Sequence, residues 1–159
     1  MWYWQLSHRA DPKARELADR HYNRQKIGSP QFVPPGRCLV LYAETPEGKA
    51  FWVTSWPFAK YVKHAWAGAW VCSAFRNEGA APASTLIRQA VMGSIGWFGV
   101  PPEKGMITFV DEKKVKPTMR HGKPVWGWTF MKAGFRPVGY TKGGLAAFQL
   151  LPQDMPVVR

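Results

Sequence analysis

Residues 69–110 place the strongest constraint on how this 159-residue chain can fold. The β-rich run "AWVCSAF" (69–75) is followed by a turn and by a helical pattern from Ser84 to Trp97. The apolar run "GMITFV" (105–110) then has the character of a buried strand. Two strands joined through a helix usually become parallel neighbours, because the helix crosses over the sheet between them. The segment therefore predicts a strand–helix–strand crossover at the centre of the fold.

The segments on either side of this crossover predict further strands and helices. An aromatic strand (2–7) precedes a helix that begins at Asp11-Pro12, where Asp is the N-cap and Pro the first helical residue. The turn "ETPEGK" joins two β-rich runs, 38–43 and 50–56, into a hairpin. A short helix ending at Gly134 leads into the last two strands, "FRPVGYTK" and "GLAAFQLL".

This order predicts a mixed α+β (α/β) fold in a single domain over residues 1–159, with a central, mostly antiparallel sheet and helices on both faces. Two stretches are less regular. "PFAKYVKHAWAG" (57–68) fits either one helical face or a long excursion. "DEKKVKPTMRHGKPV" (111–125) is expected to be a basic loop.

The charge of the chain indicates a polyanionic partner. The formal net charge is +12, and nine basic residues between Lys104 and Lys142 are opposed only by Asp111 and Glu112. Such a field attracts nucleic acid and would also favour an anionic cofactor. A basic protein without a nucleic-acid partner is the alternative. The two cysteines have no metal-ligand spacing, and the N-terminus has no long apolar run, so we expect a reduced, cytoplasmic protein without a membrane segment.

The turn after the central strand holds several candidates for binding a cofactor. Arg76 suits a phosphate, since its planar guanidinium binds two oxygens, and Asn77 suits an adenine edge. Glu78 suits an amine, a metal or a partner for Arg76, and an internal Arg–Glu pair closing the turn is the alternative for both residues. Ser84 and Thr85 stand where the helix begins, at the end whose free N–H groups attract anions.

Three residues are candidates for catalysis. His21 is suited to act as a general base or a metal ligand, and Tyr22 to donate a proton or stack on a base. Asp111 follows a buried strand and could accept a proton, orient His21 or bind a metal. The alternatives are a histidine interacting with the helix dipole, an anchoring tyrosine, and an aspartate that caps a loop or pairs with Lys113 or Lys114.

A further group of residues is expected to contact nucleic acid. Trp56 could stack on a base, although a core position is the alternative, and Lys60 and Lys63 follow it closely. The loop residues expected to hold the DNA backbone are Lys113, Lys114, Lys116, Arg120 and Lys123.

The element order and two stretches of sequence resemble the GNAT acyltransferase superfamily. "WTFMKAGFRPVGYTKGGLAAFQL" is similar to the closing segment of that fold, with Gly134-Phe135 as its Gly-Phe pair. Phe130 stands where many acetyltransferases carry a tyrosine acid, and phenylalanine has no proton to donate. "RNEGAAPASTLI" lies where these enzymes bind the pyrophosphate of coenzyme A, but it lacks their glycine spacing. An acetyltransferase would also show a V-shaped opening between its two central strands.

A narrower resemblance is to phage DNA-modification proteins of the Mom type, on "LADRHYNRQ", "SAFRNEG" and "GMITFVDEKKVK". It implies an enzyme in the host cytoplasm that adds an acetamido (carbamoylmethyl) group to the exocyclic amine of adenine in double-stranded DNA, protecting it from restriction. It leaves open whether the donor is of acyl-CoA type or the route uses iron, with His21 and Asp111 as candidate ligands, and whether the protein is a homodimer. The alternatives are a CoA-dependent N-acetyltransferase acting on a small amine or protein, and a non-catalytic nucleic-acid-binding protein.

Overall fold

The computed structural model describes residues 1–21 and 37–157. Its elements, in chain order, are β1 (Gln5–Leu6), α1 (Pro12–Asp19), β2 (Arg37–Thr45), β3 (Gly48–Trp56), the 3₁₀ turn η1 (Ala59–Tyr61), β4 (Trp70–Glu78), α2 (Ala83–Phe98), β5 (Met106–Val110), β6 (Thr118–Arg120), β7 (Lys123–Val125), α3 (Trp128–Lys132), β8 (Arg136–Tyr140), β9 (Ala146–Leu150) and the 3₁₀ turn η2 (Pro152–Asp154).

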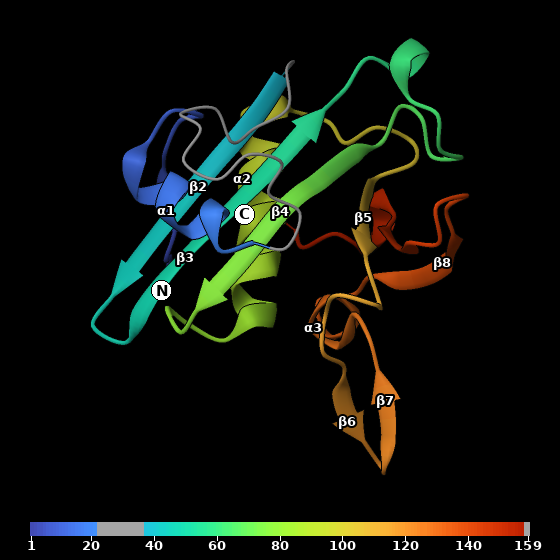
Figure 1. Cartoon of the computed structure of the whole chain (residues 1–159). Coiled ribbons are helices and arrows are strands. Elements are labelled where there is room, and N and C mark those ends of the chain that lie inside the picture. The colour runs from blue at the N-terminus through green and yellow to red at the C-terminus, as the bar shows by residue number, and fades with distance from the viewer. Residues whose placement is uncertain (22–36, 158–159) are drawn as a thin grey trace.

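One sheet of seven strands organises the described chain, in the order β1-β2-β3-β4-β5-β9-β8 (Figure 1). Only β4 and β5 run parallel, and α2 connects them, whereas the other neighbours are antiparallel. β9 lies between β5 and β8, so the last two strands of the chain form a hairpin at one edge of the sheet. The expected mixed α+β class and the mostly antiparallel sheet are confirmed.

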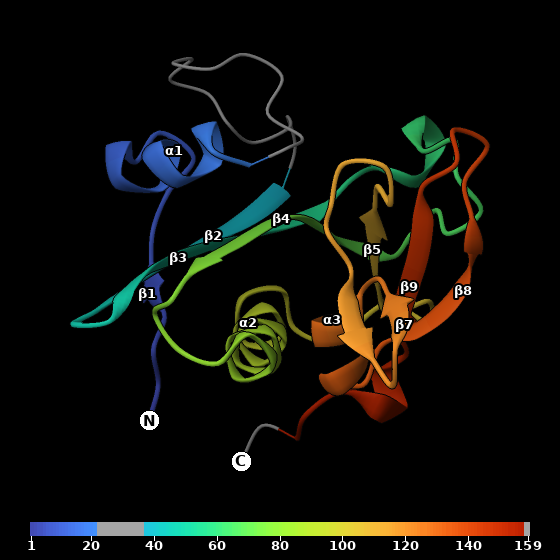
Figure 2. The ribbon, with the colours of Figure 1, turned by 60° about the horizontal axis from the view of Figure 1, so that its bottom comes forward.

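Helices cover the two faces of the sheet (Figure 2). On one face Leu17 and the alanines of α1 pack on Phe51 and Val53 of β3. On the other face the apolar side of α2, which includes Leu86 and Ile87, packs in the main core, where Trp52 and Trp70 are fully buried. Burying each large apolar side chain contributes about 1.5–3 kcal/mol, so the α2 face supplies most of the hydrophobic stabilisation.

The local signals at the helix ends act as expected. The Asp11 carboxylate accepts a hydrogen bond from the backbone N–H of Lys13 at 2.9 Å and another from the Ser7 hydroxyl at 2.7 Å, which caps α1. Helix α2 covers the expected range from Ser84 to Trp97 and extends one residue beyond each end. Helix α3 ends at Lys132, and Gly134 follows with a φ of 103°.

One extra residue in β4 sets the direction of its side chains. The pairing of β3 with β4 shifts between Val53 and Thr54, since Thr54 lies opposite Cys72 but Val53 lies opposite Ala74. Ser73 is therefore bulged, and the alternation of the strand changes after it. Cys72 packs on the α2 side, whereas Ala74 packs on the α1 side.

Two expectations from the sequence need correction, and one open alternative is decided. Only Gln5–Leu6 of the expected first strand pairs in the sheet. Residues 57–69 contain only the short η1, so they form an excursion rather than a helical face. The basic stretch 111–125 is more ordered than a loop, because it contains the β6–β7 hairpin, whose two turn residues His121 and Gly122 have φ of 52° and 75°. Within the described residues, no helix has the length and apolar character needed to cross a membrane.

Candidate functional site

The central parallel strands part soon after they meet. β4 and β5 pair only from Trp70 to Cys72 on one strand and from Met106 to Thr108 on the other. β4 continues to Glu78, so its β5-facing edge from Ser73 onward has no neighbouring strand among the described residues. An exposed strand edge presents backbone donors and acceptors that an extended ligand can use.

A cavity of about 190 Å³ occupies this opening. Its polar wall includes His21, Ser73, Thr108 and Thr129, and its apolar wall includes Phe75, Phe109 and Phe130. These residues come from the end of α1, both parted strands and the start of α3. We call this cavity the strand-split cavity; it is the only one of the described pockets that contains a sequence-predicted catalytic residue, His21.

The bulged residue Ser73 is one of the residues that line this site. The side-chain oxygens of Ser73 and Ser55 are 2.6 Å apart, although Ser55 pairs in the sheet with Val71. His21 lies against the edge of Phe51, with ring centroids 6.4 Å apart. The cavity thus combines an imidazole with hydroxyl groups in a largely apolar enclosure, a combination suited to moving a proton from an amine or a hydroxyl.

Cys72 also lines the strand-split cavity but is a poor nucleophile. Burial raises the pKa of its thiol to about 12, although hydrogen bonds with Thr108 and the Ala74 backbone lower it. A thiol in that environment stays protonated at neutral pH, and the thiolate is the reactive form. Covalent chemistry through Cys72 is therefore disfavoured.

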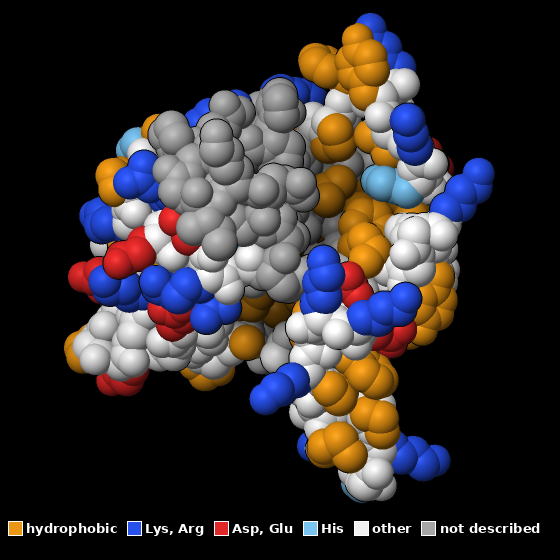
Figure 3. All heavy atoms as spheres, viewed as in Figure 1, with side chains coloured by type: hydrophobic (Ala, Val, Ile, Leu, Met, Phe, Trp, Pro, Cys, Tyr) orange, Lys and Arg blue, Asp and Glu red, His pale blue; other side chains and the backbone are white. Residues whose placement is uncertain are grey.

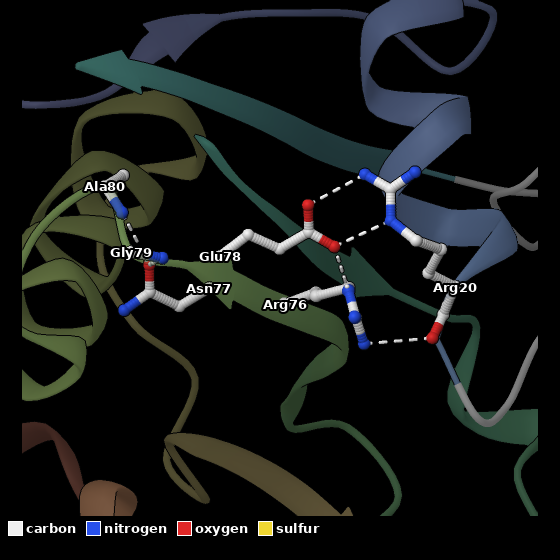
Figure 4. Close-up of polar contacts among 6 residues, drawn as sticks. All are labelled: Arg20, Arg76, Asn77, Glu78, Gly79 and Ala80. Carbon is white, nitrogen blue, oxygen red and sulfur yellow. Dashed lines mark hydrogen bonds and ion pairs between the residues drawn. The ribbon is translucent and has the colours of Figure 1, made fainter. Parts of the chain in front are cut away.

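Arg76 and Glu78 join β4 to the end of α1 rather than facing this cavity. Glu78 accepts hydrogen bonds from the guanidinium groups of Arg20 and Arg76, and Arg76 also donates to the Arg20 carbonyl at 2.9 Å (Figure 4). Arg20 and then Arg76, as hydrogen-bond donors, lower the pKa of Glu78 to about 2 despite its partial burial. The internal Arg–Glu pair is therefore present, with Arg20 as a third member.

Asn77 and the residues after it form a braced turn. The Asn77 side-chain carbonyl accepts from the backbone N–H groups of Gly79 and Ala80 at 3.0 and 3.1 Å (Figure 4). Its amide donates to the Ala81 carbonyl at 2.8 Å. Pro82 is the N-cap of α2, and Ser84 is buried in the first turn with half-buried Thr85 beside it. Two backbone donors that a phosphate could use are thus already occupied.

Asp111 does not line the strand-split cavity but caps a turn beside it. Its carboxylate accepts from the Lys113 backbone N–H at 3.0 Å, and its carbonyl accepts from Lys114 and Val115. This turn positions Val115, which does line the cavity. Within residues 1–21 and 37–157 no three His, Cys, Asp or Glu side chains come together as a metal site. Tyr22 lies outside the described residues.

The candidate nucleic-acid contacts fall into two groups. Trp56 is half-buried against Trp70 and Phe98, and the guanidinium of Arg37 lies 4.1 Å from its ring centre, so it serves mainly as core. Nearby, Lys60 lies over the ring of Tyr61, which is 71% exposed, and Lys63 is exposed. The 57–69 excursion carries these residues away from the body of the protein (Figure 1).

The second group follows the β6–β7 hairpin. Lys113, Lys114, Lys116, Arg120 and Lys123 are all exposed. The hairpin projects from the body, and Figure 3 shows Lys and Arg side chains around it. Arg120 lies 4.5 Å from the ring centre of Trp128 at the base of the hairpin. Two-stranded β-ribbons are among the elements that the major groove of DNA admits in general.

Sequence reasoning missed Ser73, Thr108 and Thr129 in the strand-split cavity. Ser73 had one signal, since it is a polar residue inside the otherwise apolar run "WVCSAF". Nothing local marked Thr108 or Thr129. Comparison of the chain with protein-family models, with curated proteins and with solved structures finds no match.

Proposed function

We propose that this protein is a GNAT-like transferase that modifies an amine of DNA, in the manner of the Mom type, at the exocyclic amine of adenine. The observation that carries the proposal is that His21 lines the strand-split cavity, at an opening between the only two parallel strands of the described sheet. The opening itself is one that an acetyltransferase would share. The order of strands, with α2 crossing between β4 and β5 and β9 inserted beside β5, supports the GNAT-like part.

The proposed reaction is a group transfer to nitrogen. The adenine nitrogen forms a bond to the electrophilic carbon of an activated two-carbon donor, and the leaving group departs with the electron pair of the broken bond. His21 takes the proton that the nitrogen loses. Ser73 and Thr129 offer hydroxyl groups that can hydrogen-bond to donor or acceptor from the cavity wall.

Neither of the two candidate cofactors, iron or coenzyme A, is supported at the residues expected to bind it. Iron is not supported by the described residues, because His21, Asp111 and Glu78 do not form a ligand group. A coenzyme A pyrophosphate is not supported at the turn before α2, where Asn77 occupies two backbone donors and Arg76 is tied to Glu78. Both observations favour a donor held mainly by the open edge of β4. Asp111 is then a positioning residue, which acts through the turn that carries Val115.

The DNA part of the proposal rests on charge. The net charge is +12, and the exposed cations of the β6–β7 hairpin flank the same side of the molecule as the parted strands (Figures 1 and 3). Phosphate contacts of this kind position a protein on a duplex without reading its sequence.

Mass spectrometry of nucleosides digested from the DNA of cells that express the protein tests the proposal. We expect a fraction of deoxyadenosine with an added carbamoylmethyl mass, absent from cells with an empty vector. Unaltered deoxyadenosine together with DNA binding by the purified protein would overturn the enzyme and favour a binding protein. Unaltered DNA together with acetyl transfer from acetyl-CoA to a small amine would favour an ordinary acetyltransferase.

A further inference from the structure

A second and larger cavity is also lined by Phe109. It has a volume of about 760 Å³, within the roughly 300–1,000 Å³ typical of ligand sites. The 57–69 excursion forms one wall through Lys63–Trp66, and the β8–β9 turn forms the other through Tyr140–Gly143 and Leu145. Phe109 of β5 lines both this excursion cavity and the strand-split cavity.

The floor of the excursion cavity is aromatic. The rings of His64, Trp66 and Phe109 contact one another, with centroids 5.0 Å apart for His64–Phe109 and 6.0 Å apart for the two other pairs. All three rings are half-buried, so each keeps exposed surface. Planar bases stack on such rings, and each stacked base contributes about 1–3 kcal/mol.

The ring of His64, which lines this cavity, has a defined tautomer. Its Nδ1 accepts the backbone N–H of Trp66 at 3.1 Å, which leaves the proton of a neutral ring on Nε2. Burial, and then the charge of Lys104, lower the pKa of His64, so the ring is neutral at pH 7. A neutral imidazole N–H suits the ring nitrogens of a base.

The rim of the cavity is cationic. Lys63 and Lys142 line it from opposite walls and are exposed, and Lys104 donates to the Ala65 carbonyl at 3.4 Å. No acidic residue is among the described residues that line it. Aromatic rings between two lysines match a single nucleotide, with its base on the floor and its phosphates at the rim. In Figure 3 hydrophobic surface and a histidine lie below the projecting excursion, with Lys and Arg around them.

We propose that the excursion cavity holds one nucleotide turned out of the DNA duplex, with its base against Trp66 and Phe109 and its flanking phosphates near Lys63 and Lys142. This inference rests on the proposed function, which requires an amine that is inaccessible inside a stacked duplex. Because Phe109 belongs to both cavities, a base seated here lies beside the site that contains His21.

Binding of labelled DNA hairpins tests this site separately from catalysis. One hairpin carries a fully paired adenine and the other the same adenine opposite an abasic site, where turning the base out costs less. We expect the wild-type protein to bind the second at least about tenfold more tightly, since unpairing costs a few kcal/mol and each 1.4 kcal/mol is a factor of ten. Trp66→Ala should reduce this preference to about threefold or less, while Trp97→Ala, at an exposed position on α2, should retain it.

A second variant tests the same site without changing the half-buried Trp66, whose replacement could affect folding. The Lys63→Ala/Lys142→Ala protein changes only exposed side chains, and it should lose several-fold more affinity for the abasic hairpin than for the paired one. Equal binding of both hairpins by the wild-type protein would overturn the inference even if modified adenine is found in cells. Tight binding of adenosine 5′-monophosphate without preference for the abasic hairpin would assign the cavity to a free nucleotide and would equally overturn it. A preference that depends on Trp66, in a protein that leaves DNA unmodified, would support the cavity and reject the enzyme.

Discussion

The guanidinium of Arg20 holds both carboxylate oxygens of Glu78, with Nε 2.7 Å from Oε2 and Nη2 2.8 Å from Oε1 (Figure 4). This pair joins the residue after α1 to the last residue of β4, which are 58 positions apart in the chain. His21 is the next residue after Arg20, and Ser73 lies on the same strand as Glu78. The ion pair therefore fixes the histidine relative to the strand that forms the strand-split cavity.

Glu78→Gln should destabilise the protein. The pKa of Glu78 falls from 4.5 to about 2, which corresponds to a ceiling of roughly 3 kcal/mol. The side chains of Arg20 and Glu78 are 43% and 27% exposed, so solvent screening reduces the expected loss to about 1–2 kcal/mol. Urea unfolding at pH 7 measures it. Glu103→Gln, at an exposed turn, is the matched control and should change the free energy of unfolding by less than about 0.5 kcal/mol.

The same pair predicts how stability depends on pH. A carboxylate whose folded pKa is lowered stabilises the fold fully above its unfolded value of 4.5, and this contribution disappears as the pH falls toward 2. The difference in unfolding free energy between wild type and Glu78→Gln should therefore shrink between pH 5 and pH 2. A difference that stays constant over this interval would show that Glu78 acts by packing and not by charge.

His21→Ala should abolish modification and leave the fold intact. A positioned general base contributes about 10²–10⁴-fold to a rate, so the yield of modified adenine should fall at least about 100-fold. The contact of His21 with the edge of Phe51 is worth only about 0.5–1.5 kcal/mol. His8→Ala, at an exposed residue before α1, is the control. Full activity of His21→Ala in the nucleoside assay would remove it from the mechanism.

Gly127→Ala should displace the helix that forms one wall of the strand-split cavity. Gly127 is the N-cap of α3 with a φ of 72°, and a Cβ there would overlap the ring of Phe148. Left-handed strain and overpacking together cost about 2–4 kcal/mol. Gly122→Ala has a similar φ of 75° but open space around the new Cβ, so it should cost only about 1 kcal/mol. Urea unfolding of the two variants separates overlap from strain, and equal losses would contradict the steric reason.

Lys116→Ala/Lys123→Ala should weaken DNA binding and its dependence on salt. Each lost phosphate contact reduces the magnitude of the slope of log affinity against log salt by about 0.9. The slope of the double variant should therefore be about 1.8 smaller in magnitude than that of the wild type. Fluorescence anisotropy from about 50 to 200 mM salt measures this slope. Lys49→Ala is the control, because Lys49 lies at the start of β3 beside Glu44, and it should leave the slope unchanged. An unchanged slope in the double variant would place the duplex elsewhere.

Local patterns were sufficient for many of the elements but not for the site. Capping by Asp11, the 38–56 hairpin and the extent of α2 follow from short-range signals, and all three were predicted. The β6–β7 hairpin was missed because its turn places His121 at positive φ, which is uncommon for a residue with a side chain. The partners of Glu78 were only half predicted, since Arg20 reaches it through the pairing of distant segments. The proximity of His21 to Ser73 likewise depends on how α1 lies across the sheet.

The bulge at Ser73 is a residue that the pairing of β3 with β4 does not use. Ser73→Ala would remove one hydroxyl from the cavity and leave every other side chain on its own face. Deleting the residue would make Cys72 and Ala74 the successive partners of Thr54 and Val53, so the other side chains of the strand would also keep their faces. A one-residue deletion here should therefore still fold, and it should alter the bend of β4 at the point where that strand leaves β5.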